Sequence, residues 1–141
     1  MGWSLTLYRV AEDAKFRVKP LDDRWQLDLS RDSFVGTEFS TLREMRRYLL
    51  ENCGARAMSA VASDNTDWLH WPGEKEWGFD IALREDPVMA IGLVDLVCRC
   101  KDFIHFFHLI NLRWPKIIIF DHDTNAFHDE ELLQQFWTDF A

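Results

Sequence analysis

Acidic and histidine side chains collect near the end of the chain. Asp121, His122 and Asp123 are consecutive, and His128 and Asp129 follow a few residues later. Carboxylates and imidazoles bind zinc and iron, and they also serve as general acids and bases in hydrolysis. This stretch therefore supports one hypothesis, a metal- or carboxylate-dependent hydrolase that uses Asp121, Asp123 and His128.

The spacing of these residues matches no established ligand pattern, such as two histidines four residues apart with a glutamate between them. His105 and His108 precede the cluster but do not complete such a pattern. No serine occupies a Gly-x-Ser-x-Gly turn, and no glycine-rich loop is present that would bind phosphate. Cys98 and Cys100 lie inside an apolar segment. We therefore predict a protein that is not an enzyme, with no metal and no cofactor.

A tryptophan-rich stretch between residues 64 and 77 suggests a binding surface instead. Tryptophan dominates many protein interfaces because it buries a large ring while its N–H finds an acceptor. Acidic neighbours would attract a basic partner. The alternative is that these tryptophans cover the edge of a sheet, since tryptophan is highly buried on average. The predicted partner-binding residues are Trp68, Trp71, Glu74, Glu76, Asp121, Asp123 and Asp129.

The acidic residues are unevenly distributed along the chain. The net charge is −8 overall. Residues 1–60 hold ten Lys or Arg against nine Asp or Glu, whereas residues 61–141 hold six against fifteen, a net charge of −9. Such a surface repels nucleic acid and favours a basic protein partner.

Length and composition predict a single globular domain over residues 1–141, because 48% of the residues are hydrophobic and no linker or repeat interrupts them. Charged residues inside the apolar run Val88–Leu112 argue against a membrane span. Three cysteines without a signal-like N-terminus predict a reducing, cytoplasmic location.

The longest predicted element is a buried helix that begins at Asp86 and ends near Pro115. A strand over Val88–Val97 followed by a shorter helix is the alternative, because Gly92 and β-branched residues weaken a helix. The helix is favoured by apolar residues that recur in steps of three and four: Met89, Leu93, Leu96, Cys100, Phe103, Phe107, Ile110 and Trp114.

Shorter elements should surround this helix. Alternating apolar residues predict strands beginning at Trp3, Trp25 and Trp77, the first two within an N-terminal meander. A capping-box sequence at Thr41 and a glycine at Gly54 bound a short helix. Residues 63–76 are predicted to be a loop, residues 116–121 an interior strand, and the chain should end in a helix whose first turn is acidic.

These elements predict an α+β fold: one mostly antiparallel sheet of about five strands, packed against a long central helix, with a shorter helix after the N-terminal strands and a C-terminal helix. Small size, acidity and the lack of a catalytic motif are similar in kind to bacterial immunity proteins, which neutralise a toxin by covering it. The functional hypothesis is thus a small acidic cytoplasmic protein-binding module of the inhibitor or immunity type, with a basic partner and no nucleic acid or membrane. A self-associating structural protein is a further alternative.

Overall fold

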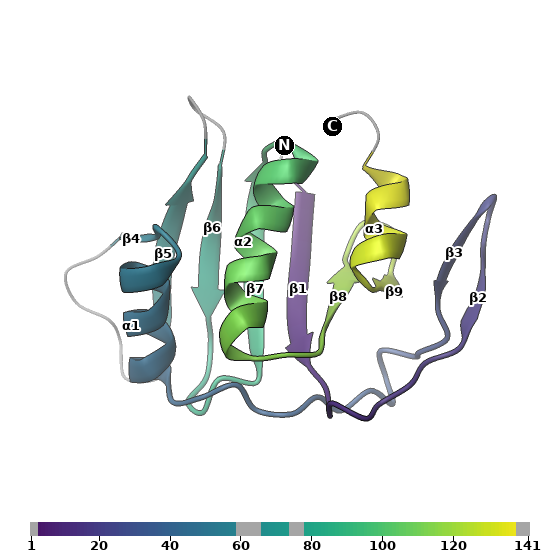
Figure 1. The fold of residues 1–141 in the computed structure, drawn as a ribbon, viewed down its shortest axis with the longest axis horizontal. Helices are drawn as coiled ribbons and strands as arrows, with labels where there is room; N and C mark the ends of the chain where they lie inside the picture. Colours follow the sequence, from purple (N-terminus) through teal and green to yellow (C-terminus); the bar gives the residue numbers. More distant parts are fainter. Residues whose placement is uncertain (1–2, 59–65, 74–77, 138–141) are drawn as a thin grey trace.

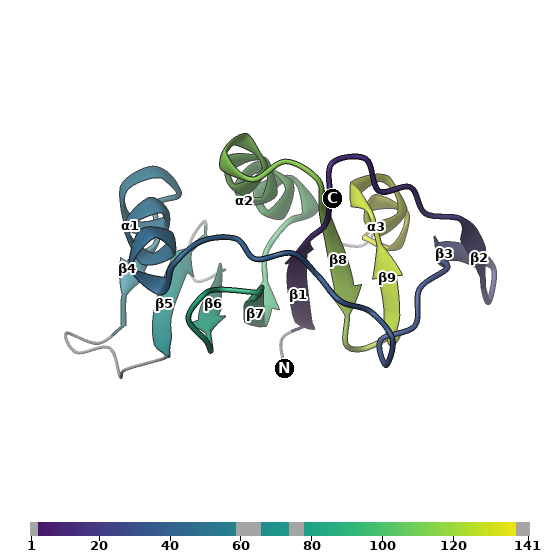
Figure 2. The same cartoon turned by 90° about the horizontal axis from the view of Figure 1, so that it is seen from below.

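The computed structural model describes residues 3–58, 66–73 and 78–137. These residues form one nine-stranded antiparallel sheet, and the three helices found among them all lie on the same face of that sheet (Figure 1, Figure 2). The strands are β1 (Trp3–Arg9), β2 (Val18–Leu21), β3 (Arg24–Leu27), β4 (Arg56–Ala57), β5 (Asp67–Pro72), β6 (Gly78–Leu83), β7 (Ala90–Val97), β8 (Ile117–Asp121) and β9 (Ala126–His128). The helices are α1 (Leu42–Asn52), α2 (Cys100–Arg113) and α3 (Glu130–Phe136).

The N-terminal strand lies in the middle of the sheet. The spatial order is β2-β3-β9-β8-β1-β7-β6-β5-β4, so β1 pairs with β7 along one side and with β8 along the other. Leu5 and Leu7 point toward the helices and are almost fully buried. Because side chains alternate between the two faces of a strand, Thr6 points to the opposite face. The alternation predicted from the sequence is confirmed for this strand.

Helix α1 has the predicted boundaries and the predicted inner face. The hydroxyl of Thr41 accepts a hydrogen bond from the backbone N–H of Glu44, which satisfies a free donor in the first turn. Met45 and Leu49 are completely buried beneath the helix. Gly54, just past the end, has φ 77, a conformation that glycine adopts without steric cost.

The predicted long central helix is wrong, and so is the sheet of about five strands. The alternative holds instead: β7 is a strand, and α2 is a separate helix of 14 residues. A helix and a strand would both place Leu93 and Leu96 on the buried side, so the spacing of apolar residues alone does not distinguish the two predictions. A β-bulge accounts for this spacing, because Asp95 has φ 53 and inserts one extra residue before Leu96.

Two further predictions are corrected by the sheet. The expected loop over residues 63–76 contains β5, whose register with β6 pairs Trp68 with Ala82 and Trp71 with Phe79. The expected N-terminal meander is absent, because β2 and β3 form a hairpin at the far edge that joins the sheet through Leu27 opposite Phe127. Long-range pairing, which has no local signature, decides both arrangements.

The main hydrophobic core fills the layer between the sheet and the helices. Strand β8, Ile117–Asp121, is buried along its whole length, as predicted for an interior strand. Its odd-numbered side chains face the helices, whereas Ile118 and Phe120 belong to a second apolar cluster on the other face. Phe34, from the segment between β3 and α1, contacts Phe127 in that second cluster.

The face of the sheet opposite the helices is here called the open face. Strand register identifies its residues, because directly paired residues share a face. Thr6 lies opposite Gly92 of β7 and Phe120 of β8. Ala82 of β6 lies opposite Gly92 and opposite Trp68 of β5. A row of paired residues therefore runs across the open face from Trp68 to Phe120, and it carries no side chain at Gly92.

Within the ranges that the structure describes, no helix is both long enough and apolar enough to cross a membrane.

The bulge in β7 provides a test of the corrected fold. At φ 53, replacing Asp95 with glycine relieves backbone strain, so Asp95→Gly should leave the free energy of unfolding unchanged or raise it. Asp95→Val should lower it by about 1–2 kcal/mol relative to Asp95→Gly, because a β-branched residue disfavours this conformation. Urea denaturation measures both values. If residue 95 were helical, Asp95→Gly would instead lower the free energy of unfolding by about 0.3 kcal/mol, and Asp95→Val would not lower it relative to Asp95→Gly.

Candidate functional site

The carboxylate of Asp121 holds a turn together. The side chain is 1% exposed and lies on the helix side of the sheet. Its Oδ1 accepts hydrogen bonds from Trp3 Nε1 at 2.6 Å and from the backbone N–H of Asp123 at 2.9 Å. Its Oδ2 accepts one from the hydroxyl of Thr124 at 3.0 Å. Because both oxygens are engaged by internal donors, this arrangement fixes the β8–β9 turn to the N-terminal strand.

The other acidic residues of the predicted cluster also have local structural roles. Asp129 caps α3, since its Oδ1 accepts from the backbone N–H of Leu132 at 2.8 Å. Asp123 is exposed in the turn after β8. His128 is fully buried, and burial lowers its pKa, while the nearby carboxylates of Asp121 and Asp129 act in the opposite direction.

The sheet separates residues that are adjacent in sequence. Asp121 and His128 face the helices, whereas His122 bonds to Thr6 on the open face. Across residues 3–58, 66–73 and 78–137, no group of three or more His, Cys, Asp and Glu side chains is arranged to hold a metal ion. Alternation along the chain directs His122 away from Asp121, and both oxygens of Asp121 already accept hydrogen bonds from internal donors.

The cysteines lack the environment of a catalytic thiol. Burial raises the pKa of Cys53 and of Cys98 to about 12, and it also raises the pKa of Cys100. A nucleophilic cysteine needs a lowered pKa so that the thiolate is present at neutral pH. All three thiols therefore remain protonated at neutral pH.

The two tryptophans of the predicted binding surface point to opposite faces of the sheet. Trp71 packs against the core: its ring stacks on Phe79 with centroids 5.0 Å apart, and its Nε1 donates to the carbonyl of Cys53 at 2.9 Å. Trp68 lies on the open face and is 39% exposed. Glu74 and Glu76 lie outside the described residues. Trp68 and Trp71 thus do not share one surface.

Polar and aromatic side chains line the open face around Trp68. The guanidinium of Arg84 lies over the Trp68 ring, 5.8 Å from its centroid. On the same face, His70 Nδ1 is 2.9 Å from a carboxylate oxygen of Asp80. These contacts fix the long side chains in place without covering Trp68, so the surface presents a largely preformed set of donors, acceptors and one indole ring.

A second group surrounds Phe120 on β8, which is four strands from β5 and Trp68 in the sheet order. The imidazole of His122 packs edge-on against this ring at 4.9 Å, and its Nε2 is 2.7 Å from Thr6 Oγ1. The guanidinium of Arg31 lies 4.7 Å from the centroid of the same ring. Burial is the main cause of the lowered pKa of His122, and Arg31 is the second.

The open face also carries several exposed apolar side chains. Seven large apolar side chains are substantially exposed among the described residues. By register, four of them belong to the open face: Val18, Trp25, Trp68 and Val97. These residues lie on β2, β3, β7 and β5, so they are spread along the nine-stranded sheet and do not form one contiguous apolar patch.

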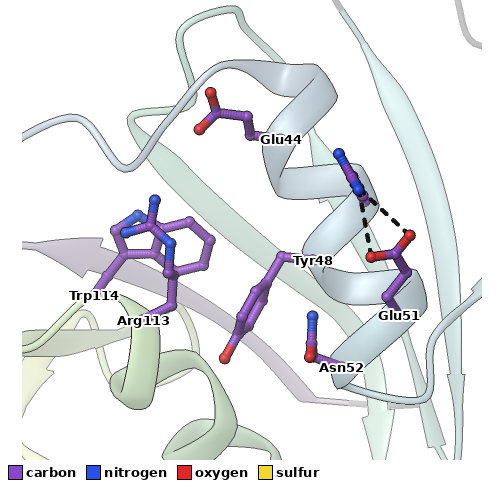
Figure 3. A pocket seen from close by; sticks show the side chains of 7 residues that line it. Glu44, Tyr48, Glu51, Asn52, Arg113 and Trp114 are labelled. Carbon is purple, nitrogen blue, oxygen red and sulfur yellow. Dashed lines mark hydrogen bonds and ion pairs between the residues drawn. The ribbon is translucent and has the colours of Figure 1, made fainter.

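A hollow of about 430 Å³ lies on the other side of the molecule, between α1 and the end of α2 (Figure 3). Tyr48 and Trp114 form its inner wall, and the Tyr48 hydroxyl donates to the carbonyl of Leu109 at 2.5 Å. Arg47 and Glu51 at its rim form an ion pair at 3.4 Å. A second charged side chain of the lining, Arg113, lies over the Trp114 ring, 5.2 Å from its centroid.

Sequence reasoning identified Trp68 but missed Arg84 over its ring, and it missed the separate contacts of Arg31 and His122 with Phe120. The alternation of Ser4, Thr6 and Tyr8 does indicate a polar face of β1. Which distant residues join that face depends on strand order, and β5, β6 and β8 are far from β1 in sequence.

A comparison of the chain with protein-family models, curated proteins and solved structures finds no significant match.

The role of Asp121 can be tested by stability. Asp121→Ala leaves three donors without their acceptor, so it should lower the free energy of unfolding by about 3 kcal/mol. Asp123→Ala is the matched control and should change it by less than about 0.5 kcal/mol, since this carboxylate is exposed. Urea denaturation of both variants gives the comparison. Equal effects would contradict a structural role for Asp121.

Proposed function

We propose that this protein is a small acidic binding module without catalytic activity, and that it inhibits a basic protein partner by covering it, in the manner of an immunity protein. The open face is the contact surface, and Trp68 is its anchor. The protein acts in the cytoplasm in this proposal. The observation that carries it is Trp68, a large aromatic residue that is 39% exposed on the sheet face that none of the described helices covers (Figure 2).

The structure behind the open face supports this role. Strands β1, β6 and β7 are backed by fully buried side chains, including Leu7, Ile81 and Leu93. A rigid surface loses little conformational entropy when it binds, which favours affinity. Trp68 adds a large ring that a partner can bury, and tryptophan is among the residues that contribute most to binding free energy.

The charge distribution supports a basic partner. A net charge of −8 on 141 residues produces a long-range field that accelerates encounter with a positively charged protein. This attraction acts before contact and weakens as salt is added. Occlusion needs no catalytic group, which agrees with the internally bonded carboxylate of Asp121 and the protonated thiols described above.

The test is affinity capture of the partner with matched variants. Tagged wild-type protein, Trp68→Ala and Leu112→Ala serve as bait in a lysate of the cells that make the protein, and mass spectrometry identifies what is retained. Leu112 is the control because it is 80% exposed on α2, away from the open face. We expect one stoichiometric basic partner, held by wild type and Leu112→Ala.

Binding of that partner to Trp68→Ala should be weaker by about 2 kcal/mol or more, which is about thirtyfold in Kd. High salt should weaken the wild-type complex as well. A partner that binds Trp68→Ala as tightly as wild type would contradict the open face as the contact surface. An acidic partner, or one insensitive to salt, would contradict the role of charge.

A further inference from the structure

We propose that the hollow between α1 and the end of α2 is a binding site for a free amino acid with an aromatic side chain. In this site Glu44 binds the ammonium group of the ligand, Arg113 binds its carboxylate, and Tyr48 contacts its side chain. The hollow lies on the helix side of the sheet, so the inference goes beyond the proposed function and does not depend on it (Figure 2). Its volume of about 430 Å³ lies within the range of small-molecule sites, about 300–1,000 Å³.

One side of α1 forms the first wall of the hollow. Glu44, Tyr48 and Asn52 are spaced four residues apart, so their side chains follow one another along the helix. Arg47 and Glu51 lie beside them and complete the lining from this helix. The opposite side of α1 enters the core, which holds the helix in position.

The end of α2 forms the second wall, and Tyr48 joins the two. The Tyr48 ring packs edge-on against Trp114 with centroids 5.0 Å apart, and its hydroxyl donates to the carbonyl of Leu109. The guanidinium of Arg113 lies over the same Trp114 ring, 5.2 Å from its centroid. Tyr48 is only half-buried and lines the hollow, so part of its ring can contact a ligand (Figure 3).

Four charged side chains line the hollow, and two of them pair with each other. Arg47 and Glu51 form an ion pair at 3.4 Å. Among the residues that the structure describes, Glu44 and Arg113 form no ion pair, although both extend from their helices toward the same space (Figure 3). The hollow therefore offers one carboxylate on α1 and one guanidinium at the end of α2, and its net charge is zero.

A zwitterion fits this pair of charges. A simple anion would be attracted by Arg113 and repelled by Glu44, and a simple cation would meet the reverse. A free amino acid carries both charges close together, so it can satisfy both side chains at once. The fork of N–H donors on arginine matches the two oxygens of a carboxylate, and an ammonium group donates to the oxygens of a glutamate.

The apolar part of the lining favours an aromatic side chain on the ligand. Among the described residues that line the hollow, Tyr48 and Trp114 are the two with large aromatic rings, and none has an aliphatic apolar side chain. Trp114 is 2% exposed, so Tyr48 supplies the surface that a ligand can reach. Aromatic rings prefer offset or edge-on contacts with one another, which adds to the gain from burying the ring.

The test is an NMR titration of isotope-labelled protein with L-phenylalanine at pH 7 and constant ionic strength. We expect saturable shifts of the backbone amides of α1 and of the end of α2, with a Kd of about 1 mM. Two analogues each lack one charge: phenethylamine has only the ammonium group, and phenylpropanoate has only the carboxylate. Each should bind about fivefold or more weakly than L-phenylalanine, because each loses one charged contact.

Two variants identify which group each side chain binds. Glu44→Gln should remove the preference for L-phenylalanine over phenylpropanoate, because the ammonium group loses its partner. Arg113→Gln should remove the preference over phenethylamine. Arg43→Gln is the matched control, since Arg43 is exposed on α1 but does not line the hollow, and this variant should bind as the wild type does. Amide spectra without ligand will show that all three variants remain folded.

Three results would overturn the proposal. The first is an absence of saturable shifts, or shifts confined to residues away from α1 and the end of α2. The second is equal binding of L-phenylalanine and either analogue by the wild type, because a site that anchors only one charge does not distinguish them. The third is an unchanged preference in Glu44→Gln or in Arg113→Gln. Binding of L-alanine as tightly as L-phenylalanine would overturn the contact with Tyr48.

Discussion

Strand β1 pairs with β7 on one side and β8 on the other, and these two pairings join the halves of the sheet. One half consists of β4 to β7, and the other consists of β8, β9 and the β2–β3 hairpin. The bond between Trp3 and Asp121 reinforces the junction at the end where the β8–β9 turn begins. Every element that contributes to the open face depends on this central strand, because it aligns Thr6 with Phe120 and Gly92.

All the described helices lie on one side of the sheet, so none of them covers the open face (Figure 2). An antiparallel sheet is stable with one face solvated, provided that the opposite face buries enough apolar surface. The helix side meets this condition with fully buried residues such as Leu5, Ile119 and Phe106. The open face is consequently free to carry the partly exposed ring of Trp68 and the charged side chain of Arg84.

Local signals in the sequence predicted those elements that depend on neighbouring residues. The Thr41 cap and Gly54 defined α1, and the uninterrupted apolar run predicted β8 as an interior strand. Residues 88–97 were mispredicted because a β-bulge at Asp95 reproduces a helical spacing of apolar side chains. The contacts of the open face could not be assembled from sequence, since Thr6 meets His122, and Arg84 meets Trp68, only through the pairing of strands.

The central claim is that the partner covers the open face, and side-chain oxidation of the purified complex tests it most directly. Hydroxyl radicals modify exposed tryptophan and leucine, so the protection of each residue can be compared with and without the partner. The account predicts that Trp68 becomes protected while Leu112, on the helix side, remains as reactive as in the free protein. Protection of Leu112 with no change at Trp68 would contradict it.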